Sequence, residues 1–120
     1  FVYGSLRPEV GHPMGVRLGR VAHYLGGARV QGELYRVSWY PALIPGRDDV
    51  RGDVYGVPES LWSELDAFEE AEGENPEYRR ELSTVLLDSG IRVEAWVYWY
   101  NRPVTGLQRL PGGDWLAAPS

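Results

Sequence analysis

Residues 77–100 read EYRRELSTVLLDSGIRVEAWVYWY and give the clearest local signal in the chain. Two runs rich in β-branched and aromatic residues, 77–87 and 91–100, flank the turn residues Asp88, Ser89 and Gly90. Because glycine adopts a positive φ at little steric cost, this spacing is typical of a β-hairpin. The stretch therefore predicts two long antiparallel strands.

The second of these strands has two different faces, because successive side chains of a strand point to opposite sides. One face is apolar throughout: Ile91, Val93, Ala95, Val97 and Trp99. The other changes from charged to aromatic and ends at Tyr98 and Tyr100. This aromatic end either lines the mouth of a pocket or packs under the C-terminal segment, so Tyr98 is a candidate substrate-binding residue.

Outside the hairpin, the pattern predicts both helices and strands. We expect helices at 14–24, ended by a glycine pair, and at 58–70, where Pro58 supplies a fixed φ. We expect strands at 1–3, 28–37 and 50–57, with an interrupted strand over 38–49. Prolines and glycines from about residue 101 remove any periodicity, which predicts a tail that packs through Leu107, Leu110 and Trp115 or lies over the surface.

Length and composition fit one α+β domain over residues 1–120, with a small curled sheet or barrel and two helices. The net charge is -5, and the twelve basic residues are all arginine and scattered, which argues against a nucleic-acid partner. No stretch has the length of a membrane span or the pattern of a signal peptide, so we expect a cytoplasmic protein without a membrane partner. Because the chain starts inside an apolar run, we also expect an initiator segment before Phe1.

Metal and thiol chemistry find little support in the sequence. Cysteine is absent, which excludes thiolate ligands and cysteine nucleophiles. The two histidines, His12 and His23, have no metal-ligand spacing with the scattered carboxylates. We therefore expect neither a metal nor another cofactor.

One carboxylate falls within the apolar arc of the predicted helix 58–70. At about 100° per residue, Glu69 projects between Trp62 and Leu65, whereas the other acids of the helix lie at or beyond the edges of the arc. Burial would raise the pKa of this carboxyl group toward the range of a general base. Alternatively, Glu69 turns outward or pairs with Arg79 or Arg80, and helical geometry alone does not decide between these interpretations.

A loop follows the first predicted strand, at Tyr3, Gly4, Ser5 and Leu6. Its free backbone N–H groups can converge on an anion, Gly4 permits close approach of a ligand, and Arg7 adds a positive charge nearby. An ordinary turn explains the same residues. Ser5 is a poor candidate nucleophile, because the sequence has no nucleophile elbow and no histidine at a suggestive spacing.

Five motifs occur in an order and spacing that resemble the gamma-glutamylcyclotransferase-like family. They cover most of the chain to about residue 100: FVYGSLR (1–7), YPA (40–42), VRGDVY (50–55), LDAFE (65–69) and YRR (78–80). The resemblance implies a small mixed β-barrel with flanking helices. It also implies that the loop of Tyr3, Gly4, Ser5 and Leu6 binds the glutamyl head of a substrate, and that the glutamate ending LDAFE, Glu69, transfers the proton.

The implied reaction needs no protein nucleophile and no cofactor. The substrate's α-amine attacks its own γ-carbonyl group, which yields 5-oxoproline and a free amine from a gamma-glutamyl amine or amino acid. Many family members have glycine after the catalytic glutamate, whereas here Glu70 follows and glycine comes only after Glu72, so Glu72 is the second candidate. The alternatives are a silent binding barrel or a protein-interaction domain of the same fold, and the oligomeric state stays open.

Overall fold

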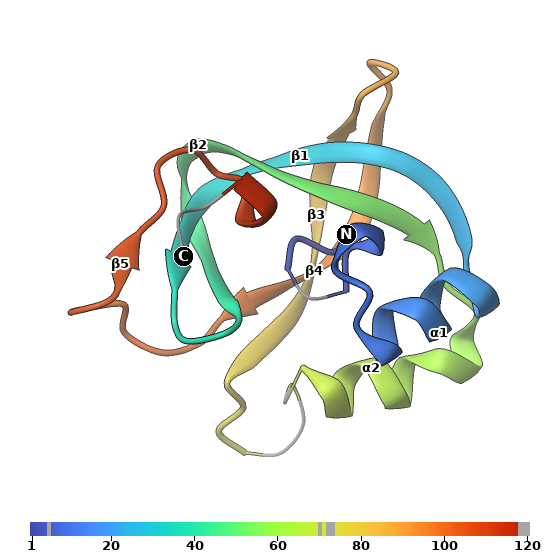
Figure 1. Cartoon of the computed structure of the whole chain (residues 1–120), viewed down its shortest axis with the longest axis horizontal. Coiled ribbons are helices and arrows are strands. Elements are labelled where there is room, and N and C mark those ends of the chain that lie inside the picture. The colour runs from blue at the N-terminus through green and yellow to red at the C-terminus, as the bar shows by residue number, and fades with distance from the viewer. Residues whose placement is uncertain (5, 70, 72–73, 118–120) are drawn as a thin grey trace.

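An antiparallel sheet of five strands forms the centre of the molecule (Figure 1). The computed structural model describes residues 1–4, 6–69, 71 and 74–117. Four strands follow the order β2-β1-β3-β4, and a short fifth strand pairs with β1. Their bounds are β1 (His23–Arg36), β2 (Pro41–Gly56), β3 (Tyr78–Leu87), β4 (Arg92–Tyr100) and β5 (Gln108–Arg109).

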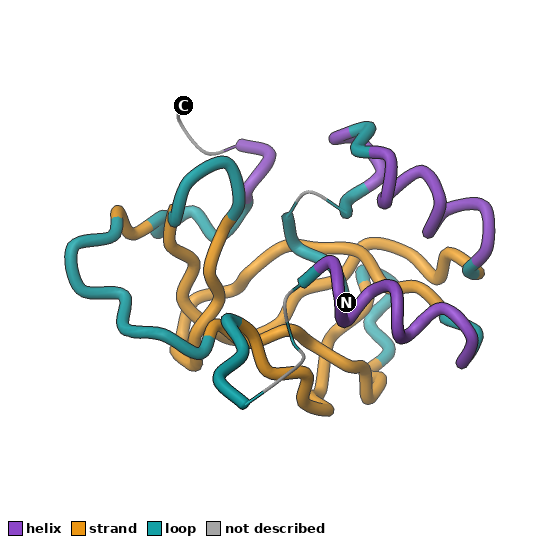
Figure 2. The backbone as a smooth tube through the Cα atoms, turned by 90° about the horizontal axis from the view of Figure 1, so that it is seen from below, coloured by secondary structure: helices purple, strands orange, loops and turns teal. Residues whose placement is uncertain are grey.

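Two α-helices cover one end of this sheet and lie side by side in Figures 1 and 2. They are α1 (Pro13–Val21) and α2 (Trp62–Phe68), and a bidentate ion pair between Arg17 and Glu64, at 2.6 and 2.8 Å, joins them. Three short 3-10 turns complete the described elements: η1 (Pro8–Val10), η2 (Glu59–Leu61) and η3 (Trp115–Ala117). The predicted α+β class is confirmed. Neither of the two helices has the length and hydropathy needed to cross a membrane.

The curled sheet separates two apolar cores. Its concave side encloses a cluster that includes Ala28, Leu34, Leu43, Val50, Val85 and Val97. The second cluster lies where the helices meet the sheet and contains Leu6, Leu18, Leu61, Leu65, Tyr78 and Tyr98. The two faces predicted for β4 therefore pack into two different cores, since Val97 belongs to the first and Tyr98 to the second.

The predicted barrel is not closed. Among the described residues no ladder joins β2 to β4, the two outer strands of the sheet order. Residues 1–3 cross the space between them instead: Val2 exchanges two backbone hydrogen bonds of 2.8 Å with Asp53 of β2, and the Phe1 nitrogen donates to the Trp96 carbonyl of β4 at 3.0 Å. A single bridge of this kind fills the seam but does not make a ladder.

A second opening lies between β1 and β3. These strands pair only at Ala28 with Leu87 and at Arg29 with Leu86. Beyond these two pairs the strands diverge and leave a depression of about 480 Å³ on the sheet. The β3–β4 hairpin is therefore joined to the rest of the sheet mainly at its turn end, where Asp88 pairs with Arg51 at 2.6 and 2.9 Å.

The hairpin itself agrees with the sequence prediction. Strands β3 and β4 pair continuously from Tyr78 with Tyr100 to Leu86 with Arg92. Gly90 has a φ of 92°, as the turn requires, and its N–H donates to the Leu87 carbonyl at 2.9 Å.

The predicted end of the first helix was wrong. The glycine pair at 26–27 does not end α1, because Ala22 is already extended and His23 begins β1 opposite Gly56. Gly26, with a φ of 129°, lies instead beside a β-bulge within β1.

The segment predicted as an interrupted strand becomes part of one long strand, β2. Pro45 fits within it because the register shifts between Gly32 and Glu33, which leaves residues 45–47 outside the regular pairing. The predicted tail also contains structure that the sequence did not indicate, since β5 pairs with β1 and the Leu110 N–H donates to the Leu34 carbonyl at 2.7 Å.

Candidate functional site

Glu69 lies in a narrow pocket beside the first residues of the chain. The pocket has a volume of about 20 Å³, which is room for about one water-sized group. It lies where the N-terminal segment, the start of β2, the end of α2 and the β3–β4 hairpin meet. Its lining is Phe1, Val2, Tyr3, Gly4, Tyr40, Pro41, Glu69, Tyr78 and Tyr98.

Helix α2 positions Glu69 through its apolar face. Leu61 and Leu65 are buried in the second core, and the Glu69 N–H closes the last helical turn by donating to the Leu65 carbonyl at 2.9 Å. Glu69 follows the last residue of α2 and is half-buried. The helix therefore ends just as its carboxylate reaches the pocket.

Burial raises the pKa of Glu69 from 4.5 to about 7, and the nearby Glu77 carboxylate adds to this shift. The shift requires that no cation compensates the charge. Among the described residues the Glu69 carboxylate has no hydrogen-bonded or ion-paired partner: Arg79 lies 3.6 Å from Glu81, and Arg80 lies 3.3 Å from Asp66. A carboxyl group with this pKa can accept and return a proton near neutral pH.

The candidate residues of the first loop divide between the pocket and the core. Tyr3 and Gly4 line the pocket, and Gly4 packs so closely on Pro41 that a Cβ atom would lie 2.8 Å from its ring. The Leu6 side chain is buried in the second core, so only its backbone remains available to a ligand. Ser5 lies outside the described residues, as do Glu70 and Glu72, the second candidate base.

Arg7 does not offer its charge to a ligand. Its buried guanidinium donates to Asp53 at 2.9 Å and to Asp114, from the C-terminal segment, at 2.8 Å. Asp53 also accepts from the Tyr24 hydroxyl at 2.7 Å. Arg7 thus fixes the end of the loop between β2 and the C-terminal segment.

Tyr98 reaches the pocket from β4, on the face that the sequence predicted as its aromatic side. Its hydroxyl donates to the Asp66 carboxylate of α2 at 2.7 Å, and its carbonyl accepts from the Tyr3 hydroxyl at 2.5 Å. Burial, followed by the charges of Asp66 and Glu69, raises the pKa of Tyr98 far above its usual value. Tyr98 is therefore neutral and connects the helix, the loop and the hairpin.

Sequence reasoning assigned no site role to Tyr40, Pro41 and Tyr78, although YPA and YRR were among the quoted motifs. The register pairs Arg80 with Tyr98, and Tyr78 is two residues from Arg80, so strand alternation puts Tyr78 on the same face as Tyr98. Applying the predicted hairpin register would have identified Tyr78. For Tyr40 and Pro41 the local sequence carries no such signal, because their place depends on contacts across the sheet.

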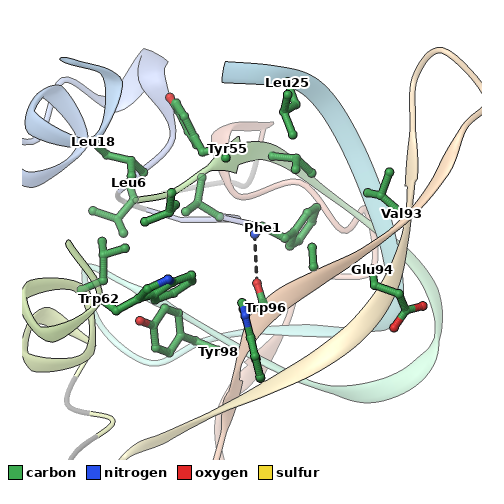
Figure 3. A pocket seen from close by; sticks show the side chains of 16 residues that line it. Phe1, Leu6, Leu18, Leu25, Tyr55, Trp62, Val93, Glu94, Trp96 and Tyr98 are labelled. Atoms are coloured by element: carbon green, nitrogen blue, oxygen red, sulfur yellow. Dashed lines mark hydrogen bonds between the residues drawn. The ribbon is translucent and has the colours of Figure 1, made fainter. Parts of the chain in front are cut away.

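A larger apolar cavity of about 300 Å³ lies on the far side of Tyr98 (Figure 3). It is bounded by α1, α2, β4 and the N-terminal segment, with Trp62, Trp96 and Phe1 around it. Among the described residues of its lining, Glu94 is the one carboxylate; it is exposed at the hairpin and accepts from the Thr84 hydroxyl at 2.5 Å. The described lining of this cavity therefore offers no buried carboxyl group for proton transfer, and the smaller pocket at Glu69 is the better candidate site.

No cluster of three or more potential metal ligands occurs within the part of the chain that the structure describes. The chemistry available in the pocket is that of one carboxyl group with a raised pKa and several tyrosine hydroxyls. Such a set can bind and deprotonate an ammonium group.

The chain is similar to known proteins over most of its length. Residues 1–117 match the profile of a family described as gamma-glutamyl cyclotransferase, AIG2-like. The gamma-glutamylcyclotransferase family protein YtfP of Escherichia coli K12 is 36% identical over 123 residues, which cover 97% of this chain and 94% of the relative.

Solved structures of similar proteins have the same fold. The solution NMR structure of E. coli YtfP superposes with a TM-score of 0.71 over 97% of this chain and 94% of that one. The crystal structure of an AIG2-like protein from Mus musculus, 25% identical, superposes with a TM-score of 0.70 over 99% of this chain and 82% of the other.

Proposed function

The chain belongs to the gamma-glutamyl cyclotransferase, AIG2-like family, and on that basis we propose that it converts a gamma-glutamyl amine or amino acid into 5-oxoproline and a free amine. Glu69 is the general acid and base of this reaction. The proposal rests on one observation above all: a half-buried carboxyl group with a pKa of about 7 lines a pocket together with Tyr3 and Gly4.

In the proposed reaction the substrate supplies the nucleophile. Glu69 removes a proton from the substrate's α-ammonium group, and the resulting amine attacks the γ-carbonyl carbon to close a five-membered ring. When the tetrahedral intermediate collapses, the bond from the γ-carbon to the leaving nitrogen breaks, and Glu69 returns its proton to that nitrogen. Binding the glutamyl group in a folded conformation supplies the proximity that the ring closure needs.

Backbone N–H groups of the loop after Tyr3 would hold the substrate carboxylate or the developing oxyanion. The Arg7 N–H donates to the Gly4 carbonyl at 3.0 Å, and this bond between residues on either side of the loop supports the role. The buried Arg7 ion pairs support it further, since they fix the end of the loop.

Incubation with gamma-glutamyl amino acids and with gamma-glutamyl-ε-lysine, followed by quantification of 5-oxoproline, tests the proposal. We expect turnover of at least one of these compounds and a loss of about 100-fold or more in kcat for Glu69→Gln, because the amide cannot accept the proton. Glu64→Gln is the matched control: Glu64 is on the same helix but exposed and paired with Arg17, so this variant should keep the parent's activity.

A Glu69→Gln variant as active as the parent would remove Glu69 from the mechanism. A parent that forms no 5-oxoproline from any of these compounds, yet binds them, would instead favour the second candidate function, a silent binding module of the same fold.

A further inference from the structure

Each tyrosine hydroxyl in the described lining of the pocket donates its proton to an acceptor within the protein, and Tyr40 donates to Glu77 at 2.7 Å. Tyr98 donates to Asp66 at 2.7 Å, Tyr78 donates to the Pro41 carbonyl at 2.6 Å, and Tyr3 donates to the Tyr98 carbonyl at 2.5 Å. A hydroxyl group has one proton and two lone pairs. Once the proton is committed, the oxygen can only accept a further hydrogen bond.

The charges around the pocket also favour a positively charged ligand. Glu69 lines it, and Glu77 is close enough to raise the pKa of Glu69. No arginine, lysine or histidine side chain is among the described residues of the lining. The nearest basic group in this network, Arg80, is 3.3 Å from Asp66 and lies between the rings of Trp62 and Trp96, at 4.3 and 5.0 Å from their centroids.

We propose that Asp66 and the Pro41 carbonyl engage the hydroxyl protons of Tyr98 and Tyr78, so that both oxygens are left to accept hydrogen bonds from a substrate ammonium group. An –NH₃⁺ group has three N–H donors and no acceptor. The volume of about 20 Å³ matches a single group of this size. Asp66 is a positioning residue in this arrangement, because it acts through Tyr98.

This inference rests on the proposed function and extends it to specificity. A ligand carboxylate in the same place would be repelled by the lone pairs of the tyrosine oxygens and by the charge of Glu69. The pocket therefore discriminates between the ammonium and the carboxylate group of an amino acid. The substrates accepted by this site must carry a free α-amine, and compounds in which the amine is absent should be rejected at binding, before any chemistry.

Two ligands that are not turned over separate binding from catalysis: L-glutamate and glutarate, which lacks the amine. Isothermal titration calorimetry at pH 8 measures both dissociation constants. We expect the parent to bind L-glutamate about 10-fold or more tightly than glutarate, because a hydrogen bond to a charged group is among the stronger ones in proteins. Tyr78→Phe and Tyr98→Phe should each reduce this ratio by about 3-fold or more.

Tyr100→Phe is the matched control. Tyr100 is on the same strand as Tyr98 and packs against Tyr78 at 5.4 Å between ring centroids, but it does not line the pocket. The Tyr100→Phe variant should leave the ratio of the two dissociation constants unchanged. Thermal unfolding of every variant checks that the Pro41 carbonyl, left without the Tyr78 donor, has not altered the fold.

Asp66→Asn tests the positioning role. The asparagine amide can donate to Tyr98 and turn its hydroxyl proton into the pocket, so the ratio should fall in the parent background. In the Tyr98→Phe background the same substitution should have no further effect on the ratio, whereas a merely structural role would give additive losses.

The inference is overturned if the parent does not bind L-glutamate more tightly than glutarate, if both tyrosine variants keep the parent's ratio, or if Asp66→Asn adds its effect to Tyr98→Phe. These outcomes are independent of turnover. An enzyme that forms 5-oxoproline but keeps its ratio in the tyrosine variants refutes only this inference, and a protein that keeps the predicted ratios without turnover refutes only the proposed reaction.

Discussion

Burial moves the pKa of Glu69 into the neutral range. Its pKa of about 7 has two causes, first its burial and then the Glu77 carboxylate. If Glu69 is the general base, only its ionised form starts the reaction. We therefore expect kcat/KM to rise with pH through about 7 and then to level off, and a pH profile of 5-oxoproline formation checks this.

The same pKa affects stability with a definite sign. Because the folded state binds this proton more tightly than the unfolded state, the stabilising contribution is complete below about pH 4.5 and is lost as the pH rises through about 7. Relative to Glu69→Gln, the parent should lose about 3 kcal/mol of unfolding free energy between pH 4.5 and 8. Urea denaturation at the two pH values measures this difference.

Glu64 provides a control, because the pH dependence of its contribution to stability has the opposite sign. Its hydrogen bonds with Arg17 lower the pKa of its carboxyl group, so its stabilising contribution decreases as the pH falls. A parent whose stability relative to Glu69→Gln does not change with pH would contradict the raised pKa and, with it, the shape expected of the activity profile.

For individual residues, the sequence indicated Glu69 as the candidate base but did not indicate most of the residues that surround it. The angle of Glu69 on the helix follows from 3.6 residues per turn, which is local information. Its lack of a cation does not, because the sequence offers Arg79 and Arg80 nearby, and only the folded structure brings Arg80 to Asp66 and Arg79 to Glu81. Tyr78 needed the strand register, and Tyr40 needed the whole sheet.

Among the elements, those defined by local patterns were predicted well. The β3–β4 hairpin combines alternation with a turn glycine, and both signals are contained in 24 consecutive residues, 77–100. The first helix was predicted too long because His23 pairs with Gly56, a residue 33 positions later in the sequence. Long-range pairing of this kind overrides the helical periodicity of residues 22–24.

The C-terminal segment stabilises the loop of the candidate site from a distance. Asp114 accepts from Arg7 at 2.8 Å and also from the Leu116 N–H at 3.0 Å. Asp114→Ala removes both hydrogen bonds and leaves the buried Arg7 with one carboxylate, so we expect a loss of about 2 kcal/mol of unfolding free energy. Asp114→Asn, which keeps a side-chain acceptor, should lose about half as much.

Urea denaturation measures these losses, and Asp48→Ala is the comparison. Asp48 pairs with Arg109 at 2.7 Å in a more exposed setting, where an ion pair contributes about 0.5 kcal/mol. If Asp114→Ala costs no more stability than Asp48→Ala, the C-terminal segment does not support the loop in the way described.

For the molecule as a whole, the sequence and the family resemblance predicted the fold class and its components but not the closure of the sheet. A curled sheet was expected from the number and spacing of the strands. Whether its outer strands meet depends on contacts between Val2 and Asp53 and between Phe1 and Trp96, which lie 51 and 95 positions apart. No local pattern specifies such a seam.

The weak connection between β1 and β3 predicts how the native state opens. The β1–β2 ladder extends from His23 with Gly56 to Arg36 with Pro41, whereas β1 and β3 share two residue pairs. In native-state hydrogen exchange we expect the amides that link β3 and β4 to the rest of the sheet to exchange faster than those within the β1–β2 ladder. Equal protection of both groups would contradict this expectation.

The two-pair connection also divides the candidate site between two parts, which are joined there by the hydrogen bonds from Tyr98 to Asp66, from Tyr78 to the Pro41 carbonyl and from Tyr3 to the Tyr98 carbonyl. Tyr78 and Tyr98 belong to the hairpin, whereas Glu69 and Tyr3 belong to the remainder of the chain. Widening a pocket that has room for about one water-sized group would therefore require these hydrogen bonds to break, so substrate access and the network around Glu69 are coupled.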